Sequence, residues 1–135
     1  MVLLDSSALI EFLRDNPSPA ADLVDRALAV EEAAITDAVI LEVLADARRD
    51  DVADTRRLLY ACDYLGTWPR DDWEEAAAIY RRCRQQGFTP SSRIDCLLAA
   101  VALRTAVPVL HHDADFDGIA ACTGLEVVSG LRSSR

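Results

Sequence analysis

The sequence contains no lysine, and all 14 of its basic residues are arginines. Reactions that need a lysine amine, such as Schiff-base formation and P-loop nucleotide binding, are therefore excluded. The 23 acidic residues outnumber the basic ones and give a net charge of −9, which argues against nucleic-acid binding through a broad basic surface. Arginine clusters such as Arg48–Arg49 suit phosphate, although a solvated helix face is the simpler interpretation of each cluster.

The residues that build zinc sites, disulfide frameworks and membrane spans are also scarce. The 4 cysteines lie far apart with no C-x-x-C pair, and the 2 histidines are adjacent. We interpret the cysteines as buried, reduced thiols. No apolar run approaches the roughly 20 residues that a membrane span needs, and no basic signal segment precedes the apolar residues 2–4. The expected compartment is the cytoplasm.

The length and hydropathy pattern predict one α/β domain over residues 1–135. A chain of 135 residues with 51% hydrophobic residues can fill a single core. Short apolar runs alternate with helical spacing, which is typical of βα units with a parallel sheet. The predicted strands are residues 2–4, 33–35, 64–67, 107–110 and 125–128. Six helices are predicted. The first spans residues 8–14, the second begins at residue 19 after a Ser18 cap, and the third is capped by Asp37. The fourth is capped by Asp50 or Asp51 and runs to about residue 62, the fifth begins at residue 71 and is closed by Gly87, and the sixth is capped by Ser91–Ser92.

Acidic residues recur where the predicted strands end. Asp5 directly follows the first strand, and Asp113 and Asp115 follow the strand that ends at residue 110. Asp95 falls in the first turn of a helix, and Glu42 sits beside the apolar stripe of another. Ligands of open α/β sheets bind beyond the carboxyl ends of the strands. Each acid alone has a plain explanation as a turn-forming, capping or solvated residue, so the hypothesis of a site depends on the whole set.

Several carboxylates at one point need a neutralising partner. Two of them 4 Å apart repel by up to about 4 kcal/mol at an effective dielectric constant near 20. A cluster of oxygen ligands without cysteine or converging histidines suits Mg²⁺ or Mn²⁺. Such an ion keeps positions open for a phosphate and a water, so the expected chemistry is phosphodiester hydrolysis.

Four segments of the chain resemble the PIN-domain family, and most closely its VapC-type toxins of bacterial toxin–antitoxin pairs. These segments are residues 2–10 around Asp5, Glu42 in a helix after the second strand, Arg93–Ile94–Asp95 and His112–Phe116. Their order and spacing fit nearly the whole chain. The resemblance implies a three-layer α/β/α sandwich with a mainly parallel sheet, Mg²⁺- or Mn²⁺-dependent endoribonuclease activity, and inhibition by a VapB-like antitoxin.

The resemblance also implies roles for individual acids. Asp5, Glu42, Asp95 and Asp113 match the acidic quartet that the family uses for catalysis and metal binding. Asp115 matches a further acid that is often present and is expected to bind the metal with them.

Three other positions near these acids are informative. Ser7 matches the small hydroxyl residue that helps to order the family's site. His111 stands where the family often has threonine, which changes the local hydrogen bonding. Asp117 is interpreted as a capping or solvated residue.

An acidic protein that cuts RNA needs local positive charge. We hypothesise that Arg48, Arg49 and Arg93 contact RNA phosphates near the site. The net negative charge favours a basic partner, such as an antitoxin with arginine-rich segments. The groove of this protein that would receive the antitoxin is predicted to include apolar residues, although most of them also suit the core. These residues are Phe12, Leu13, Leu58, Leu59, Trp68 and Trp73. The family further implies a homodimer, or a hetero-oligomer with the antitoxin.

Alternatives from other classes fit less well. HD-type metal phosphohydrolases need histidine and aspartate ligands on separate helices, and two-component receiver domains need a lysine. Haloacid-dehalogenase-like phosphatases have a second aspartate where this chain has Ser7. The alternative that stays open is a catalytically silent PIN-like module that binds RNA or protein. The intact set of acids argues against this alternative, because a module that binds no metal has no physical reason to retain carboxylates that repel each other.

Overall fold

Five short parallel strands form the centre of the computed structural model, which describes residues 1–131. The order of the strands in the sheet is β3-β2-β1-β4-β5, and every neighbouring pair is parallel. Their bounds are β1 (Val2–Leu4), β2 (Ala33–Ile35), β3 (Asp63–Tyr64), β4 (Val109–His111) and β5 (Val127–Ser129). All five carboxyl ends therefore lie at one edge of the sheet, as the hypothesis of a site at the strand ends requires.

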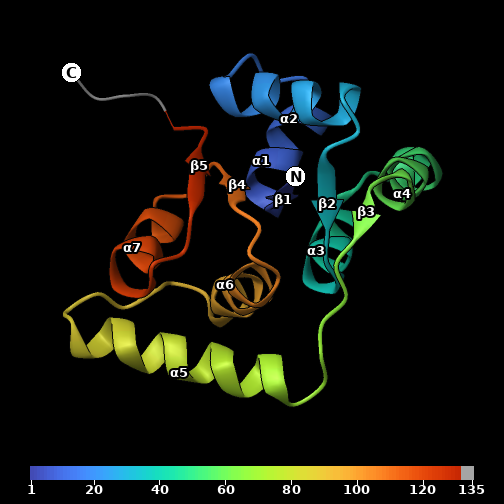
Figure 1. Ribbon diagram of the computed structural model, residues 1–135. Helices are drawn as coiled ribbons and strands as arrows, with labels where there is room; N and C mark the ends of the chain where they lie inside the picture. The colour runs from blue at the N-terminus through green and yellow to red at the C-terminus, as the bar shows by residue number, and fades with distance from the viewer. Residues whose placement is uncertain (132–135) are drawn as a thin grey trace.

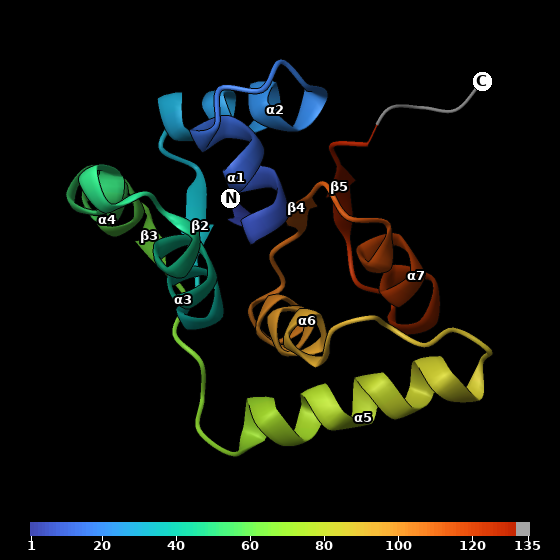
Figure 2. The same ribbon diagram turned by 180° about the vertical axis from the view of Figure 1, so that it is seen from behind.

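Helices lie on both sides of the strands. In both views α2 lies above the strands, whereas α5 and α6 lie below them (Figures 1 and 2). The helices are α1 (Ser6–Leu13), α2 (Pro19–Ala29), α3 (Asp37–Asp46), α4 (Val52–Ala61), α5 (Asp71–Gln85), α6 (Arg93–Thr105) and α7 (Ala114–Thr123), with a 3₁₀ turn, η1 (Arg49–Asp51), before α4. This arrangement confirms the predicted α/β/α sandwich with a parallel sheet.

Helix α6 is the most deeply buried helix of the sandwich. Every residue from Asp95 to Ala102 is buried, so this helix is enclosed on all sides. Helix α5 packs along α6 and buries a single apolar stripe that contains Ala76, Ile79 and Cys83. The first turn of α6, which carries Asp95, is consequently held by the core and not by a surface loop.

Several of the predicted element boundaries are confirmed. Strands β1 and β2 have the predicted bounds. Ser18 caps α2 by accepting a hydrogen bond from the Ala21 N–H at 3.1 Å, and Ser92 caps α6 by accepting one from the Ile94 N–H at 3.2 Å. Gly87 follows the end of α5 with a positive φ of 86°, a conformation that glycine adopts without strain.

The predicted cap of the third helix is wrong. Thr36 occupies the capping position of α3, and Asp37 is its first helical residue. The Asp37 carboxylate accepts hydrogen bonds from the Tyr64 hydroxyl at 2.6 Å and the Thr67 N–H at 2.9 Å. It ties the segment after β3 to the start of α3, a long-range role that local sequence does not reveal.

The other differences concern element ends. Strand β3 comprises residues 63–64 and not 64–67. Strands β4 and β5 each begin two residues later and end one residue later than predicted, and α1 spans residues 6–13 and not 8–14. Helix α4 follows a 3₁₀ turn, and Asp51 at its start makes no side-chain capping bond. Within residues 1–131, none of the helices combines the length and apolar character needed to cross a membrane.

Helix α7 was not predicted, because its acidic beginning was interpreted as a turn. Asp113 is its N-cap and accepts a hydrogen bond from the Asp115 N–H at 3.0 Å. Phe116 and Ile119, three residues apart, form its buried side. A capping aspartate followed by that apolar spacing was the signal for a helix.

The four cysteines are free thiols, in agreement with the sequence. Cys83 and Cys96 are buried as predicted, whereas Cys62 and Cys122 are partly exposed.

An ion pair between α5 and α6 holds the loop before α5. Arg104 donates two hydrogen bonds to the Asp72 carboxylate, at 3.0 and 2.9 Å, and one to the Gly66 carbonyl at 2.8 Å. Its guanidinium also lies 4.1 Å from the centre of the Trp68 ring. Burial alone would raise the pKa of Asp72, but the hydrogen bonds from Arg104 and the Trp68 N–H hold that pKa below its ordinary value.

Replacing Arg104 should therefore destabilise the fold. In Arg104→Met the buried Asp72 charge loses its partner, and we expect a loss of about 3–5 kcal/mol at neutral pH, measured by urea unfolding. Because the folded-state pKa of Asp72 is lowered, the contribution is present above the ordinary aspartate pKa of 3.8 and is lost as the pH falls below it. Arg57→Met, which breaks the exposed Arg57–Asp54 pair, should have almost no effect. Equal effects of the two variants would contradict this prediction.

Candidate metal centre

Four of the predicted acids lie at the carboxyl ends of two adjacent strands or at the beginnings of three helices, and Glu42 lies further along α3. Asp5 follows β1 and caps α1, and Asp113 follows β4 and caps α7. Strands β1 and β4 are paired, and the Asp5 N–H donates to the Leu110 carbonyl at 2.9 Å. The unpaired N–H groups at helix N-termini favour negative charge, so the fold itself offsets part of the repulsion among these carboxylates.

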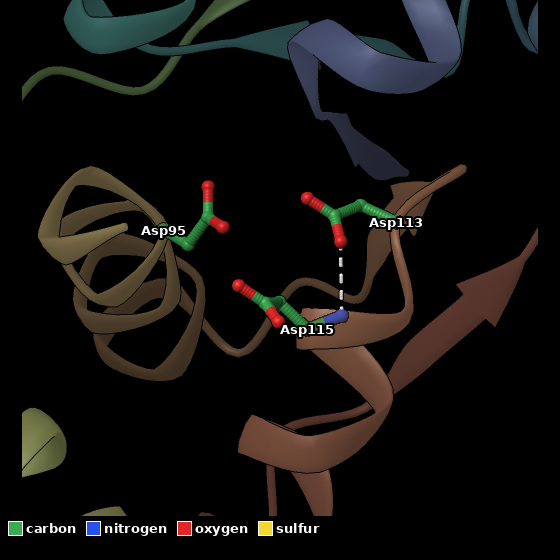
Figure 3. A group of neighbouring side chains, drawn as sticks. All are labelled: Asp95, Asp113 and Asp115. Carbon is green, nitrogen blue, oxygen red and sulfur yellow. Dashed lines mark hydrogen bonds between the residues drawn. The ribbon is translucent and has the colours of Figure 1, made fainter. Parts of the chain in front are cut away.

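Three carboxylates form the centre of the cluster. Asp95, Asp113 and Asp115 each offer one oxygen atom, and these oxygens all lie within 4.8 Å of one another. Figure 3 shows the three side chains pointing toward a shared space from α6 and from the beginning of α7. The donor set consists of carboxylate oxygens, which suits a hard divalent cation and not a soft metal.

Asp95 carries the electrostatic strain of the cluster. Burial is the main reason that its pKa is raised to about 8, and the charges of Asp5, Asp113, Asp115 and Glu42 raise it further. Without a cation, Asp95 therefore holds a proton at neutral pH. A bound cation would reverse this effect by favouring the charged carboxylate.

Asp5 and Glu42 lie outside the group of three but within electrostatic reach of it. Burial raises the pKa of Asp5, hydrogen bonds from Ser7 oppose this effect, and the charge of Asp113 adds to it. Burial likewise raises the pKa of Glu42, against a hydrogen bond from Ser6 and with a contribution from the charge of Asp5. The structure thus brings all five predicted acids into one electrostatically coupled region.

Two adjacent serines of α1 orient two of the acids. The Ser7 hydroxyl donates to the Asp5 carboxylate and accepts from the His112 N–H at 2.9 Å. The Ser6 hydroxyl donates to Glu42 Oε1 at 3.0 Å, across 36 residues of sequence. Ser7 was predicted to support the site, whereas Ser6 was missed because its partner is evident only in the folded chain.

Ser91 is a second residue that the sequence did not reveal as part of the site. Its N–H donates to Asp115 Oδ2 at 2.8 Å, and its hydroxyl donates to the same oxygen. Ser91 therefore joins the loop before α6 to the first turn of α7, while Ser92 alone caps α6. The signal available in the sequence was a pair of hydroxyl residues where a single cap is sufficient.

The predicted phosphate-binding arginines do not lie together. Arg93 begins α6 two residues before Asp95, and its guanidinium lies 4.8 Å from the centre of the Tyr80 ring. Arg48 lines a cavity of about 730 Å³ between α1, α3 and α4, which we call the α1–α4 groove. Arg49 begins the adjacent 3₁₀ turn.

The α1–α4 groove starts one helical turn from the acids. Its lining includes Ile10, four residues after Ser6, and Asp46, four residues after Glu42. Of the apolar residues predicted for a partner groove, Leu13 and Leu58 line it. The other four lie elsewhere: Leu59 is buried in the core, Phe12 packs against the core, Trp68 lies under Arg104, and Trp73 is exposed on α5.

His111 and Asp117 are hydrogen-bonded to each other. His111 is completely buried, and its Nε2 lies 3.1 Å from Asp117 Oδ1. His111 Nδ1 accepts a hydrogen bond from the Asp113 N–H at 3.1 Å. Asp117 lies exposed in the first turn of α7, as its interpretation as a capping or solvated residue predicts, and it also bonds His111.

Residues 2–121 match the family described as the PIN domain. This chain belongs to the PIN-domain family. It is 39% identical over 132 residues to ribonuclease VapC11 of Mycobacterium tuberculosis, a match that covers 96% of this chain and 98% of the relative. It is also 39% identical over 132 residues to VapC ribonuclease Mb1587 of Mycobacterium bovis, with the same coverage of both chains. The resemblance found in the sequence is thereby confirmed.

Solved structures have the same fold. A DNA-bound VapBC of Salmonella typhimurium superposes with a TM-score of 0.75 at 14% identity, covering 97% of this chain and all of the other. PIN nucleases are metal-dependent, and in this member Asp95, Asp113 and Asp115 could bind a metal ion.

The raised pKa of Asp95 makes the metal-free protein sensitive to pH. Because the folded state keeps a proton that the unfolded state releases above pH 3.8, stability should fall as the pH rises from about 4 to about 8. Asp95→Asn removes this titration. Its melting temperature in chelator should exceed that of the unmodified protein at pH 8, by about 3–5 °C for each kcal/mol of strain relieved. Asp25→Asn on the exposed side of α2 is the control, and a pH profile of Asp95→Asn that parallels that of the unmodified protein would contradict the prediction.

Proposed function

We propose that this protein is a Mg²⁺- or Mn²⁺-dependent endoribonuclease that hydrolyses RNA phosphodiester bonds as the toxin of a toxin–antitoxin pair. The observation that carries the proposal is the cluster of three carboxylates, of which Asp95 is buried and Asp113 and Asp115 are partly buried, in a chain 39% identical to a named VapC ribonuclease over nearly its full length. A cytoplasmic location belongs to the same proposal, because the substrate is cellular RNA.

The proposed roles divide among the acids and their hydrogen-bond partners. Asp5, Glu42, Asp95 and Asp113 are the catalytic and metal-binding residues, and Asp115 is a further metal ligand. Their support is the electrostatic coupling of Asp95 to the other four and the short distances among Asp95, Asp113 and Asp115. When bound, a divalent ion supplies an activated water and stabilisation of the leaving oxygen.

The chain's own residues prepare the site for that ion. Ser7 fixes the orientation of Asp5 through its hydroxyl and backbone N–H, and Ser6 draws Glu42 toward the site from α3. A cation held by Asp95, Asp113 and Asp115 would favour the ionised form of Asp95 over its protonated form. Burial of Asp5 and Asp95 limits the access of bulk water, which would strengthen the attraction between these carboxylates and a bound cation.

Arginines on the approach to the site provide the charge that RNA requires. Arg93 is two residues from Asp95, and Arg48 and Arg49 lie by the α1–α4 groove. We propose that all three contact phosphates, with Arg93 nearest to the scissile bond.

We also propose that a VapB-like antitoxin occupies the α1–α4 groove. The groove combines apolar side chains with three carboxylates that outnumber its two arginines; the residues are Leu13, Leu58, Asp46, Asp51, Asp54, Arg14 and Arg48. This lining suits a basic amphipathic segment, which could extend from the groove to the acids one turn away. The VapBC complexes with the same fold support this partner, and a homodimer or a hetero-oligomer with the antitoxin belongs to the same proposal.

Removing single carboxylates should abolish RNA cleavage without unfolding the protein. Asp5→Asn, Asp95→Asn and Asp113→Asn should each lower the cleavage rate of purified, antitoxin-free protein by at least about 100-fold, because changes that only disturb metal ligands indirectly already cost 10–100-fold. Cleavage should require Mn²⁺ or Mg²⁺ and stop in chelator. Asp25→Asn should cleave like the unmodified protein, and the same rate in the site variants would assign the activity to a contaminant.

Metal binding separates this function from that of a silent module. Saturating Mn²⁺ at about 100 times its dissociation constant should stabilise the folded protein by about 2.7 kcal/mol, seen as a higher melting temperature. The shift should be smaller in Asp113→Asn. If neither a shift nor cleavage is seen, the protein is a non-catalytic PIN module.

Charge reversal should reveal the RNA-binding arginines. Arg48→Glu, Arg49→Glu and Arg93→Glu should each raise the KM for RNA roughly fivefold, which corresponds to about 1 kcal/mol of lost binding. The effect should diminish at high salt, because the contacts are made to phosphates. Arg26→Glu on the exposed side of α2 is the matched control. Values of KM equal to that of this control would exclude a role for the arginine tested.

A further inference from the structure

A buried histidine supports the loop that carries Asp113. His111 is the last residue of β4 and is 0% exposed. Its Nδ1 accepts the Asp113 N–H at 3.1 Å, and its ring packs beside Phe116 with 5.5 Å between the ring centres. The imidazole is therefore fixed by a hydrogen bond and by packing.

These contacts define the hydrogen-bonding roles of the two ring nitrogens of His111. Since Nδ1 accepts a hydrogen bond from a backbone N–H, the ring proton must be on Nε2. Nε2 then donates to Asp117 Oδ1 at 3.1 Å, and the side chain of Asp117 is 47% exposed. The imidazole of His111 thus connects the backbone of Asp113 to the first turn of α7.

In the loop between β4 and α7, two side chains accept hydrogen bonds from consecutive backbone N–H groups. The His112 N–H donates to the Ser7 hydroxyl at 2.9 Å, and the Asp113 N–H donates to His111. With its backbone held in this way, Asp113 uses Oδ1 to accept the Asp115 N–H. Its carboxylate is then oriented toward Asp95 and Asp115, as Figure 3 shows.

We propose that His111 and Asp117 are positioning residues for the metal ligand Asp113. His111 fixes the Asp113 backbone through Nδ1, and Asp117 fixes the tautomer and the orientation of His111. The inference rests on the proposed function, because it takes Asp113 to be a metal ligand. Hydrogen-bond partners of metal ligands typically contribute 10–100-fold to metal affinity, so both residues should have a measurable effect on it.

The test compares variants that keep or remove one hydrogen bond each. His111→Asn retains an acceptor near the place of Nδ1, whereas His111→Leu has a similar size and no acceptor. Asp117→Asn retains an acceptor for Nε2, and Asp117→Ala does not. The measurements are the Mn²⁺ dissociation constant by calorimetry, the melting temperature in chelator, and kcat and KM for RNA cleavage.

We expect His111→Leu to weaken Mn²⁺ binding by about 10–100-fold and to lower kcat while the KM for RNA stays the same. His111→Asn should recover a large part of the loss. Asp117→Ala should weaken Mn²⁺ binding by less than His111→Leu does, and Asp117→Asn by less again. A purely structural role would change only the melting temperature in chelator and would leave the Mn²⁺ affinity of the folded protein unchanged.

Two results would overturn the inference. One is that folded His111→Leu binds Mn²⁺ with the same dissociation constant as the unmodified protein. If that variant does not fold, the same result for Asp117→Ala overturns the inference. The other is a His111→Asn variant no better than His111→Leu, since rescue depends on the acceptor. If the unmodified protein binds Mn²⁺ and the variants bind it equally well, only this inference fails. If the unmodified protein binds no Mn²⁺, the proposed function fails together with it.

Discussion

The mutual repulsion of buried carboxylates is the constraint on which the rest of the site depends. Asp5 and Asp95 are almost completely buried, and the charges of four other acids act on Asp95. Water cannot relieve this repulsion, so the protein must do so by other means. It places the acids at helix N-termini, surrounds them with hydrogen-bond donors, and leaves a proton on Asp95 until a cation is present. The raised pKa of Asp95 reflects its burial first and the charges of the other four acids second.

Hydroxyl groups connect segments that are distant in the sequence. Ser6 joins α1 to Glu42 on α3, Ser7 joins Asp5 to the loop after β4, and Ser91 joins the loop before α6 to Asp115. Each serine donates to a carboxylate, so each bond orients an acid and also ties two elements together. The geometry of the site is consequently determined by tertiary contacts as much as by the sheet.

Much of this arrangement can be predicted from the sequence, because some signals are local. Apolar runs followed by Asp5 or Asp113 indicate strands that end in acids, and parallel strands bring these ends to one edge. Other features depend on partners far away in the chain. The bond from Ser6 to Glu42 spans 36 residues, and that from Ser91 to Asp115 spans 24, so neither has a local signature. Helix α7, in contrast, has a local signal in its capping Asp113, and it was missed because its acidic beginning was interpreted as a turn.

The enclosed position of α6 links the chemistry of the protein to its packing. Ala99, Ala100 and Ala102 have at most 1% of their surface exposed, so the helix that carries Asp95 has no free side along which it can shift. Interiors are packed as densely as organic crystals, and an added methyl group displaces whole elements. Larger side chains at these three positions would shift α6 and so change the distances between Asp95 and the other acids. The packing of α6 therefore helps to set the geometry of the acidic site.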